Sequence, residues 1–267
     1  MNEIRDLLIG IDIGKEYTQI CYYDRKAEEA RSLSMKVGTS QYEAPGCICY
    51  RTEQNDYCVG LEAQYFSREK GGIMLGNIYD ICQKEESIQV AGEDKEPAEL
   101  LAHFLKGMLK FLGIQDIVKN TKCMCITSPE LDAIQVRNYQ KACGIAGFPA
   151  EKYMLMDYGE SFYYYALGQK RETWNRSVAW YAFDGDKIAF RKLTINAASR
   201  PILVNLEEPV STTLETEDEI RDVEFCRFIT KTLGKELFSS VQITGEGFDQ
   251  QWAQQSVKLL CHQGRKV

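Results

Sequence analysis

The chain has 267 residues, of which 44% are apolar and 27% are charged. This composition is typical of a folded globular protein and argues against disorder or a fibrous repeat, while the length suffices for one large domain or two moderate ones. The 39 acidic side chains outnumber the 32 basic ones, giving a net charge of −7, so nucleic acid is not the expected main partner.

No membrane-spanning segment is expected. The longest uninterrupted apolar stretch, 178–183, is far shorter than the roughly 20 residues that cross a bilayer. The first six residues are mixed in charge, and Asp12 interrupts the apolar run that follows, a pattern that does not fit a secretory signal. We therefore expect a cytoplasmic protein.

The ten cysteines raise the question of a metal or disulfide site. The two close pairs, Cys47/Cys49 and Cys123/Cys125, are separated by one residue. On a strand this spacing puts both thiols on one face instead of around an ion. In a reducing compartment we expect the cysteines to pack as small buried side chains.

The first part of the chain begins with a predicted hairpin. The apolar run 7–14 is interrupted by Gly and Asp residues and is followed by the run 17–24, which predicts two strands joined by a tight glycine turn. A third strand is expected at 31–37. The mixed segment 38–94 predicts an inserted subdomain. Its expected elements are strands at 47–50 and 56–59 and a helix at 61–68.

Two long helices are predicted next. Apolar residues recur at i, i+3 and i+4 spacing over 100–112, behind Glu96-Pro97, and predict a helix. After a strand at 122–127, Ser128-Pro129 has the residue types of a helix start, which predicts that the helix over 131–145 is capped there. A strand at 153–156 and a helix at 160–167 are expected to follow.

The second half of the chain repeats this pattern. A hairpin is predicted from strands 177–184 and 187–195 with a turn at Gly185-Asp186. Because strands and helices alternate, and a second hairpin recurs in a unit similar to the first, we expect a duplicated α/β architecture with a central cleft. The remaining expected elements are strands at 201–206 and 241–244 and helices at 220–233 and 249–261.

Three glycine-containing turns stand at predicted strand ends: Asp12-Ile13-Gly14, Asp184-Gly185-Asp186 and Gly245-Glu246-Gly247. Glycine lets backbone N–H groups approach a phosphate closely, and a carboxylate at a strand end can hold magnesium through water. Each turn alone is a weak indication, because Asp-Gly is also a common hairpin sequence. Their order along the chain is more informative.

That order resembles the actin, sugar kinase and heat-shock chaperone ATPase superfamily, and the resemblance covers most of the chain. Residues 9–18 are similar to the first phosphate loop of the chaperone branch. Residues 126–168 resemble its succession of a strand ending near Pro, an Arg-bearing helix ending in Ala-Gly, and a connecting helix ending in Gly. Residues 181–185 are similar to the second phosphate strand, and residues 243–248 to the adenosine-binding turn.

The resemblance implies a two-lobed, duplicated ribonuclease H-like fold, with mixed sheets and flanking helices. Lobe I would span 1–150 and contain the inserted subdomain, about 38–94. Lobe II would span 151–267. Its outer subdomain would be reduced, and it would be incomplete at the C-terminal side, because the resemblance predicts one more strand and a Gly-Ala-rich helix.

The resemblance also implies a site for ATP or ADP with magnesium. Asp12 and Asp184 would face the metal, and Asp157 or Glu160 would be the carboxylate that acts on water. The expected nucleotide contacts are Gly14, Lys15, Gly185, Gly245, Glu246 and Gly247. The alternative for the aspartates is that they bind local backbone N–H groups in turns, and for Asp157 and Glu160 that they are carboxylates favoured at a helix start.

The departures from the family pattern indicate weak or lost turnover. The first loop has Lys15-Glu16 where the chaperones have small hydroxylated residues, and the second has Asp186-Lys187, which places an extra carboxylate beside the phosphates. We therefore expect ATP binding with weak or no hydrolysis. The alternative is a catalytically silent protein-interaction or assembly module, and a third possibility is a small-metabolite kinase, for which no base motif is evident. A protein partner is expected, and Tyr163-Tyr164-Tyr165 points around a helix, so at least one ring should be exposed.

Overall fold

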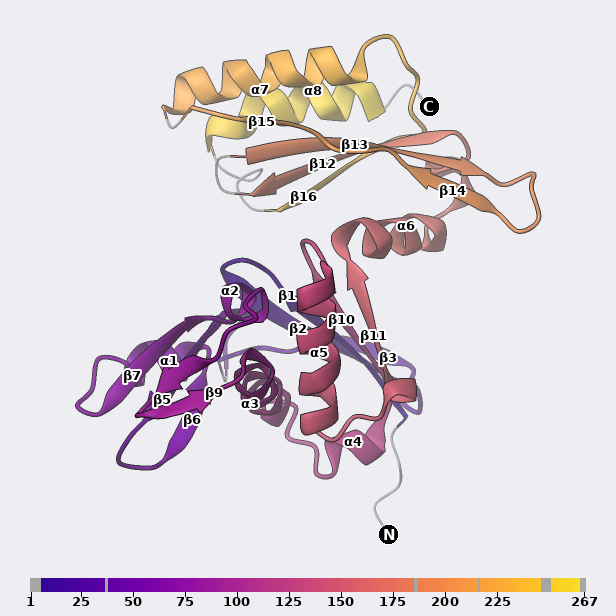
Figure 1. Ribbon diagram of the computed structural model, residues 1–267. Helices are drawn as coiled ribbons and strands as arrows, with labels where there is room; N and C mark the ends of the chain where they lie inside the picture. Colours follow the sequence, from indigo (N-terminus) through magenta and orange to yellow (C-terminus); the bar gives the residue numbers. More distant parts are fainter. Residues whose placement is uncertain (1–5, 37, 185–186, 216, 246–250, 265–267) are drawn as a thin grey trace. The chain divides into compact units, whose positions relative to one another are not determined.

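The computed structural model describes residues 6–36, 38–184, 187–215, 217–245 and 251–264 (Figure 1). It is a mixed α/β structure, as predicted. The chain divides into two compact units, Met1–Ser161 and Phe162–Val267, and the boundary falls inside helix α6 (Tyr158–Gly168). No helix within the described ranges is long and apolar enough to cross a bilayer.

The large sheet of unit 1 has the strand order β11-β10-β1-β2-β3, with β4 also paired to β2. Strands β1 and β2 form the predicted antiparallel hairpin, whereas β10 and β11 run parallel to β1. The strands are β1 (Leu7–Ile13), β2 (Tyr17–Asp24), β3 (Glu29–Ser32), β4 (Glu43–Pro45), β10 (Thr121–Ser128) and β11 (Tyr153–Asp157).

The core of unit 1 lies between this sheet and helices α3 (Pro97–Lys110) and α5 (Ala133–Ile145). Alternate residues of β1, Ile9, Ile11 and Ile13, are buried against the helices, which is the period of two that a strand imposes. Helix α3 begins at the predicted position, because the Glu96 and Glu99 side chains form a reciprocal capping box.

The segment between β3 and α3 forms a small three-stranded sheet of order β6-β5-β7 and a separate β8-β9 hairpin. Tyr57 on β6 stacks on His103 of α3, with ring centroids 4.1 Å apart, so this segment packs against the helix. Its elements are β5 (Cys47–Arg51), β6 (Asp56–Val59), α1 (Leu61–Phe66), β7 (Gly72–Asn77), α2 (Ile78–Cys82), β8 (Ile88–Val90) and β9 (Glu93–Lys95). The short helix α4 (Ile117–Asn120) follows α3.

Two predicted boundaries in unit 1 are wrong. The third strand ends at Ser32 instead of continuing to 37, because the Ser34 hydroxyl, whose oxygen lies 2.8 and 2.7 Å from the carbonyl oxygens of Lys36 and Thr39, shares its one hydrogen bond between them and closes a loop. Helix α5 is not capped at Ser128, which is the last residue of β10. Asp132 caps it, in a reciprocal pair with Gln135.

Unit 2 has a sheet of order β14-β13-β12-β16, with β15 paired to β13. Strands β12 and β13 form the predicted second hairpin, and β16 runs parallel to β12. Helices α7 and α8 lie side by side over one face of the sheet (Figure 1). The elements are β12 (Ser177–Asp184), β13 (Lys187–Asn196), β14 (Leu203–Leu206), β15 (Val210–Thr213), α7 (Asp218–Leu233), β16 (Ser240–Gly245) and α8 (Gln254–Gly264).

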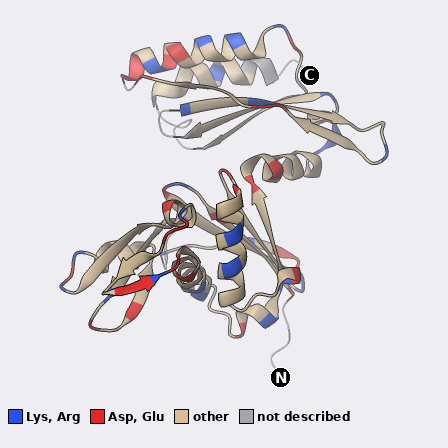
Figure 2. Cartoon of the chain, viewed as in Figure 1, with Lys and Arg blue, Asp and Glu red and all other residues tan. Residues whose placement is uncertain are grey.

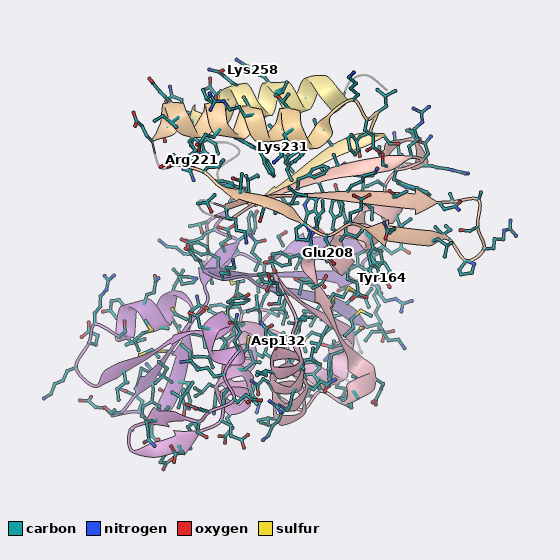
Figure 3. All side chains as sticks on the ribbon, turned by 45° about the horizontal axis from the view of Figure 1, so that its top comes forward. Asp132, Tyr164, Glu208, Arg221, Lys231 and Lys258 are labelled. Carbon is teal, nitrogen blue, oxygen red and sulfur yellow. The ribbon has the colours of Figure 1, made fainter. Side chains whose placement is uncertain are left out.

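Aromatic side chains fill the core of unit 2. Tyr181 is fully buried on β12, within 6.3 Å of the Phe225 and Phe228 rings of α7, measured between centroids. The three tryptophans of the chain are also buried in this unit: Trp174, Trp180 and Trp252. Tyr164 and Tyr165 of α6 are 52% and 54% exposed, as the sequence predicted for at least one ring of that run. Tyr164 is labelled in Figure 3.

Candidate functional site

The predicted carboxylates of unit 1 stand at one edge of its large sheet. Asp12 near the end of β1 is opposite Thr127 of β10, and Ser128 of β10 is opposite Asp157 of β11. Because β1, β10 and β11 are parallel, their carboxyl ends meet at this edge. Asp12 and Asp157 lie two strands apart, which corresponds to about 10 Å between strand axes.

Asp12 is half-buried and hydrogen-bonded at this edge. The Thr127 hydroxyl donates to Asp12 Oδ1 at 3.1 Å, and the Tyr158 side chain also hydrogen-bonds to the carboxylate. Burial raises the pKa of Asp12 above its ordinary value of 3.8, the bonds from Tyr158 and Thr127 lower it, and the charge of Glu43 raises it. The net direction is upward, so an ionised Asp12 favours a nearby cation.

The turn after β1 is held in a fixed shape. The Gly14 N–H donates to the carbonyl of Tyr17 at 2.9 Å. A Cβ at Gly14 would lie only 3.0 Å from that carbonyl oxygen and 3.2 Å from the Tyr158 hydroxyl, so a side chain would be crowded there. Asn77 Nδ2 donates to the Lys15 carbonyl at 2.6 Å, which ties the turn to the segment before α2.

Asp157 and Glu160 occupy the start of α6. Asp157 Oδ1 accepts a hydrogen bond from the Glu160 backbone N–H at 2.7 Å, and Glu160 is in the first turn of the helix. Carboxylates are favoured at this position because the N–H groups and dipole of a helix start attract negative charge. Asp157 thus binds a backbone N–H at the start of α6. This is the arrangement expected if the carboxylate supports the helix start.

In unit 2 the structure describes only part of the predicted site. Gly185, Glu246 and Gly247 lie outside the described residues, as does the side chain of Asp184. The backbone of Asp184 ends β12, beside the end of β16, where Phe183 is paired with Gly245. Asp184 and Gly245 therefore lie at the ends of adjacent parallel strands.

Gly245 is at a position that only glycine can fill. Its φ is +95°, and a Cβ there would lie 1.9 Å from the Phe183 carbonyl oxygen. Both the left-handed backbone and the close approach of β16 to β12 exclude a side chain. The last residue of β16 therefore has a backbone conformation that requires glycine.

The described residues are suited to hold magnesium through water, not by direct coordination from several side chains. They contain no group of three or more His, Cys, Asp or Glu side chains placed to hold a metal directly. Asp12 supplies one half-buried carboxylate, with the hydroxyls of Thr127 and Tyr158 beside it. This donor set suits a hydrated ion such as magnesium, which usually keeps several waters and takes one or two protein carboxylates.

Three residues at the unit 1 site were not assigned a role from the sequence: Thr127, Tyr158 and Asn77. Thr127 contacts Asp12 from β10, and Tyr158 contacts it from α6, so these contacts become apparent only once the strands are paired. Asn77 had a usable local signature, because Asn is a preferred helix cap and its Oδ1 accepts from the Tyr79 N–H at 2.8 Å at the start of α2.

The comparison with protein families gives one assignment. Residues 29–267 match the family described as "Family of unknown function (DUF5716) C-terminal". The match covers most of the chain, which therefore belongs to this family. No curated protein matches the chain.

Proposed function

We propose that this member of the DUF5716 family is a nucleotide-binding protein with an actin-like ATPase fold, which binds ATP or ADP with magnesium and hydrolyses ATP weakly or not at all. The observation that carries the proposal is a repeated strand order. Unit 1 has the order β3-β2-β1-β10-β11, and unit 2 has β14-β13-β12-β16. In each unit, the first three strands pair in antiparallel order. A later strand, β10 in unit 1 and β16 in unit 2, pairs in parallel with the other edge of the first strand.

This arrangement supports a duplicated ribonuclease H-like fold. In each unit the first strand ends in an aspartate, Asp12 near the end of β1 and Asp184 at the end of β12. Carboxyl ends of parallel strands are the usual place for ligands in α/β sheets. A carboxylate near a strand end is suited to hold a hydrated cation, which a phosphorylated ligand would bring with it.

In the proposed function, different residues of unit 1 would contact the magnesium ion and the phosphates. Asp12 would hold hydrated magnesium through its half-buried carboxylate. The turn at Gly14 and Lys15 would lie beside phosphate; its Gly14 N–H is bonded to the Tyr17 carbonyl, and Asn77 ties the Lys15 carbonyl to the segment before α2. When bound, the magnesium ion would neutralise phosphate charge.

The same site explains why turnover should be low. Asp157 already accepts the N–H of Glu160 and is engaged at the start of α6, which leaves it poorly placed to take a proton from water. Lys15 and Glu16 have long side chains where the chaperones that the sequence resembles have small hydroxylated residues. We therefore propose that nucleotide binding, and not hydrolysis, is the main activity of this protein.

Thermal unfolding of the full chain with and without ATP and magnesium tests the proposal. A ligand at about 100 times its dissociation constant stabilises the folded state by about 2.7 kcal/mol. Asp12→Asn should remove this stabilisation, because it takes away the charge that faces the cation. Asp116→Asn is the matched control: Asp116 is exposed, has a left-handed φ of 50° that Asn tolerates, and lies outside the site.

The outcomes separate the candidate functions. Absence of any shift at millimolar nucleotide would reject nucleotide binding and favour the silent interaction module. A shift that survives in Asp12→Asn would mean that the site lies elsewhere. If the shift is present and specific, phosphate release followed over hours measures whether hydrolysis accompanies binding, and we expect little or none.

A further inference from the structure

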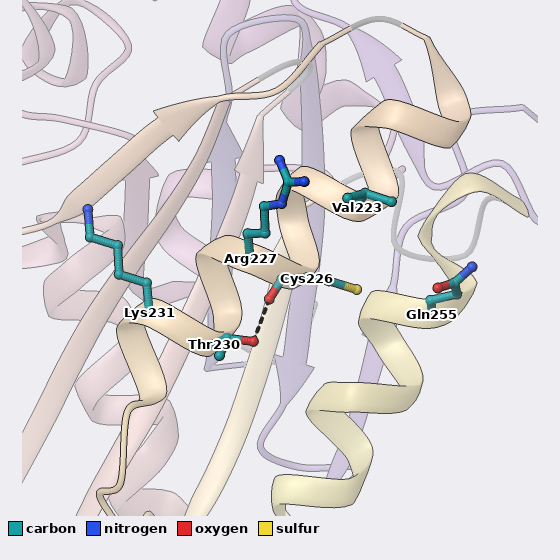
Figure 4. Close-up of a pocket in the computed structure, with 6 residues that line it drawn as sticks. All are labelled: Val223, Cys226, Arg227, Thr230, Lys231 and Gln255. Atoms are coloured by element: carbon teal, nitrogen blue, oxygen red, sulfur yellow. Dashed lines mark hydrogen bonds between the residues drawn. The ribbon is translucent and has the colours of Figure 1, made fainter.

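A groove lies between the two helices of unit 2. It has a volume of about 460 Å³ and is lined by Val223, Cys226, Arg227, Thr230 and Lys231 of α7 and Gln255 of α8 (Figure 4). Val223 is 43% exposed, and the Cys226 thiol lies 3.4 Å from the Ser256 hydroxyl on α8. The groove therefore has an apolar floor that is open to solvent.

Basic side chains border this floor. Arg227 and Lys231 are exposed and four residues apart on α7, so they project from the same side of the helix. Lys258 is exposed on α8 three residues after Gln255, which places it on the same face as that groove residue. Among the residues described by the structure, no ion pair involves these three cations.

The helix dipole accounts for only part of this charge. Figure 2 shows acidic bands at the start of α7 and basic bands toward its end. Lys231 is in the last turn of α7, where a cation is favoured by the dipole. Arg227 lies a full turn earlier, and Lys258 belongs to the middle of α8, so the dipole gives no reason for either cation.

The neighbouring carboxylates of α7 bind backbone N–H groups, not the rim cations. Asp222 is buried, and its oxygens accept the backbone N–H groups of Gln255 and Ser256 at 3.1 and 3.0 Å. Glu224 accepts the backbone N–H of Glu215 at 3.0 Å. Both acidic groups on this part of α7 are thus engaged with backbone, and among the described residues neither forms an ion pair with Arg227 or Lys231.

We propose that this groove docks an acidic peptide segment of a partner protein. An aliphatic side chain of the peptide lies on Val223 and Cys226, and flanking carboxylates pair with Arg227 and Lys231. The combination of an apolar floor and a cationic rim selects for a peptide that carries both features. A purely anionic ligand leaves Val223 exposed, and a purely apolar one leaves the cations without partners.

Selection from a library of randomised displayed peptides, with the full chain as bait, tests the inference. The expected peptides carry Asp or Glu around a Leu, Ile or Met. One selected peptide, synthesised with a fluorescein label, then gives dissociation constants by anisotropy. Arg227→Glu with Lys231→Glu should weaken binding at least about tenfold through like-charge repulsion, and added salt should weaken it further.

A matched charge reversal controls for net charge. Lys106→Glu with Lys110→Glu changes two exposed cations at the same four-residue spacing on α3 of unit 1, and it should leave peptide binding unchanged. Val223→Ser tests the floor and should weaken the peptide without altering the charge. Arg227→Gln with Lys231→Gln gives a milder loss in the same direction and serves if the double reversal does not fold.

Three results would overturn the inference: no enriched peptide, enriched peptides without acidic residues, or selected peptides that bind the Arg227→Glu and Lys231→Glu variant equally well. Binding of phosphatidylserine vesicles or single-stranded RNA in place of peptides would also reject it and assign the rim to another anion. The nucleotide-dependent thermal shift should persist in every groove variant, so the two proposals fail independently.

Discussion

The two sheets of this protein share a strand order but not a core. In both units the first four strands are arranged in the same way. Aliphatic residues such as Ile11 and Leu105 fill unit 1, whereas Tyr181, Phe225 and Trp252 fill unit 2. Strand order follows from short connections and parallel crossovers, and a core requires only apolar side chains of suitable volume. One topology has therefore been built with two kinds of packing.

The sheets also differ in how their loops are supported. In unit 1 the turn after β1 is held from outside the sheet, by the Asn77 side chain on the Lys15 carbonyl. In unit 2 the strand end at Gly245 is shaped by its own close approach to Phe183. Removing a supporting side chain should cost little unfolding free energy. A close backbone contact, by contrast, leaves no room for an added side chain. The following substitutions test this difference.

The largest effect is expected at Gly245. In Gly245→Ala the new Cβ meets the Phe183 carbonyl oxygen at 1.9 Å in a backbone with φ of +95°, so unit 2 should lose at least about 3 kcal/mol of unfolding free energy. Gly168→Ala is the control, because a Cβ there meets nothing within 4 Å and should be neutral or slightly stabilising. Urea unfolding followed by circular dichroism compares them, and equal stabilities would refute the close approach.

An intermediate effect is expected at Asn77. Asn77→Ala removes the cap of α2 and the bond to the Lys15 carbonyl, at a cost of about 1 to 2 kcal/mol. Asn77→Asp keeps the cap acceptor but sets a carboxylate oxygen against the Lys15 carbonyl, so it tests the loss of that bond with the cap retained. Hydrogen exchange at the amides of the turn should rise in both variants. Unchanged exchange would show that Asn77 does not hold the turn.

The smallest effect is a pH dependence at Asp12. The folded pKa of Asp12 is raised above 3.8, mainly by burial, so its neutral form stabilises the fold below 3.8 and this contribution is lost as pH rises through the folded pKa. Asn mimics the neutral form at every pH. Asp12→Asn should therefore exceed the wild type in unfolding free energy at neutral pH, and the two should converge toward 3.8. A constant difference would contradict the raised pKa.

Local patterns predicted the hairpins well. The β1–β2 hairpin was located from its apolar runs and glycine turn, and the start of α3 from Glu96-Pro97. Ser128-Pro129 misled because it has the composition of a helix start, while Asp132 and Gln135 make the actual reciprocal cap. Residue types alone did not decide between two possible caps a few residues apart.

The tertiary contacts at these sites could not be predicted from the sequence. Nothing near Asp12 in the sequence indicates that Thr127 and Tyr158 will surround it, because strand pairing brings them together across more than a hundred residues. The groove on α7 and α8 was also missed, since its lining comes from two helices whose sequence spacing does not reveal that they are neighbours. The individual elements follow from local rules, and the sites arise from their packing.

The placement of the aromatic residues has a spectroscopic consequence. Because Trp174, Trp180 and Trp252 are all buried in unit 2, intrinsic tryptophan emission reports the unfolding of that unit alone. Tyr50, Tyr57 and Tyr139 are among the emitters of unit 1. Excitation selective for indole would therefore follow one sheet while circular dichroism follows both, and the native chain can show without any label whether its two units melt together or one after the other.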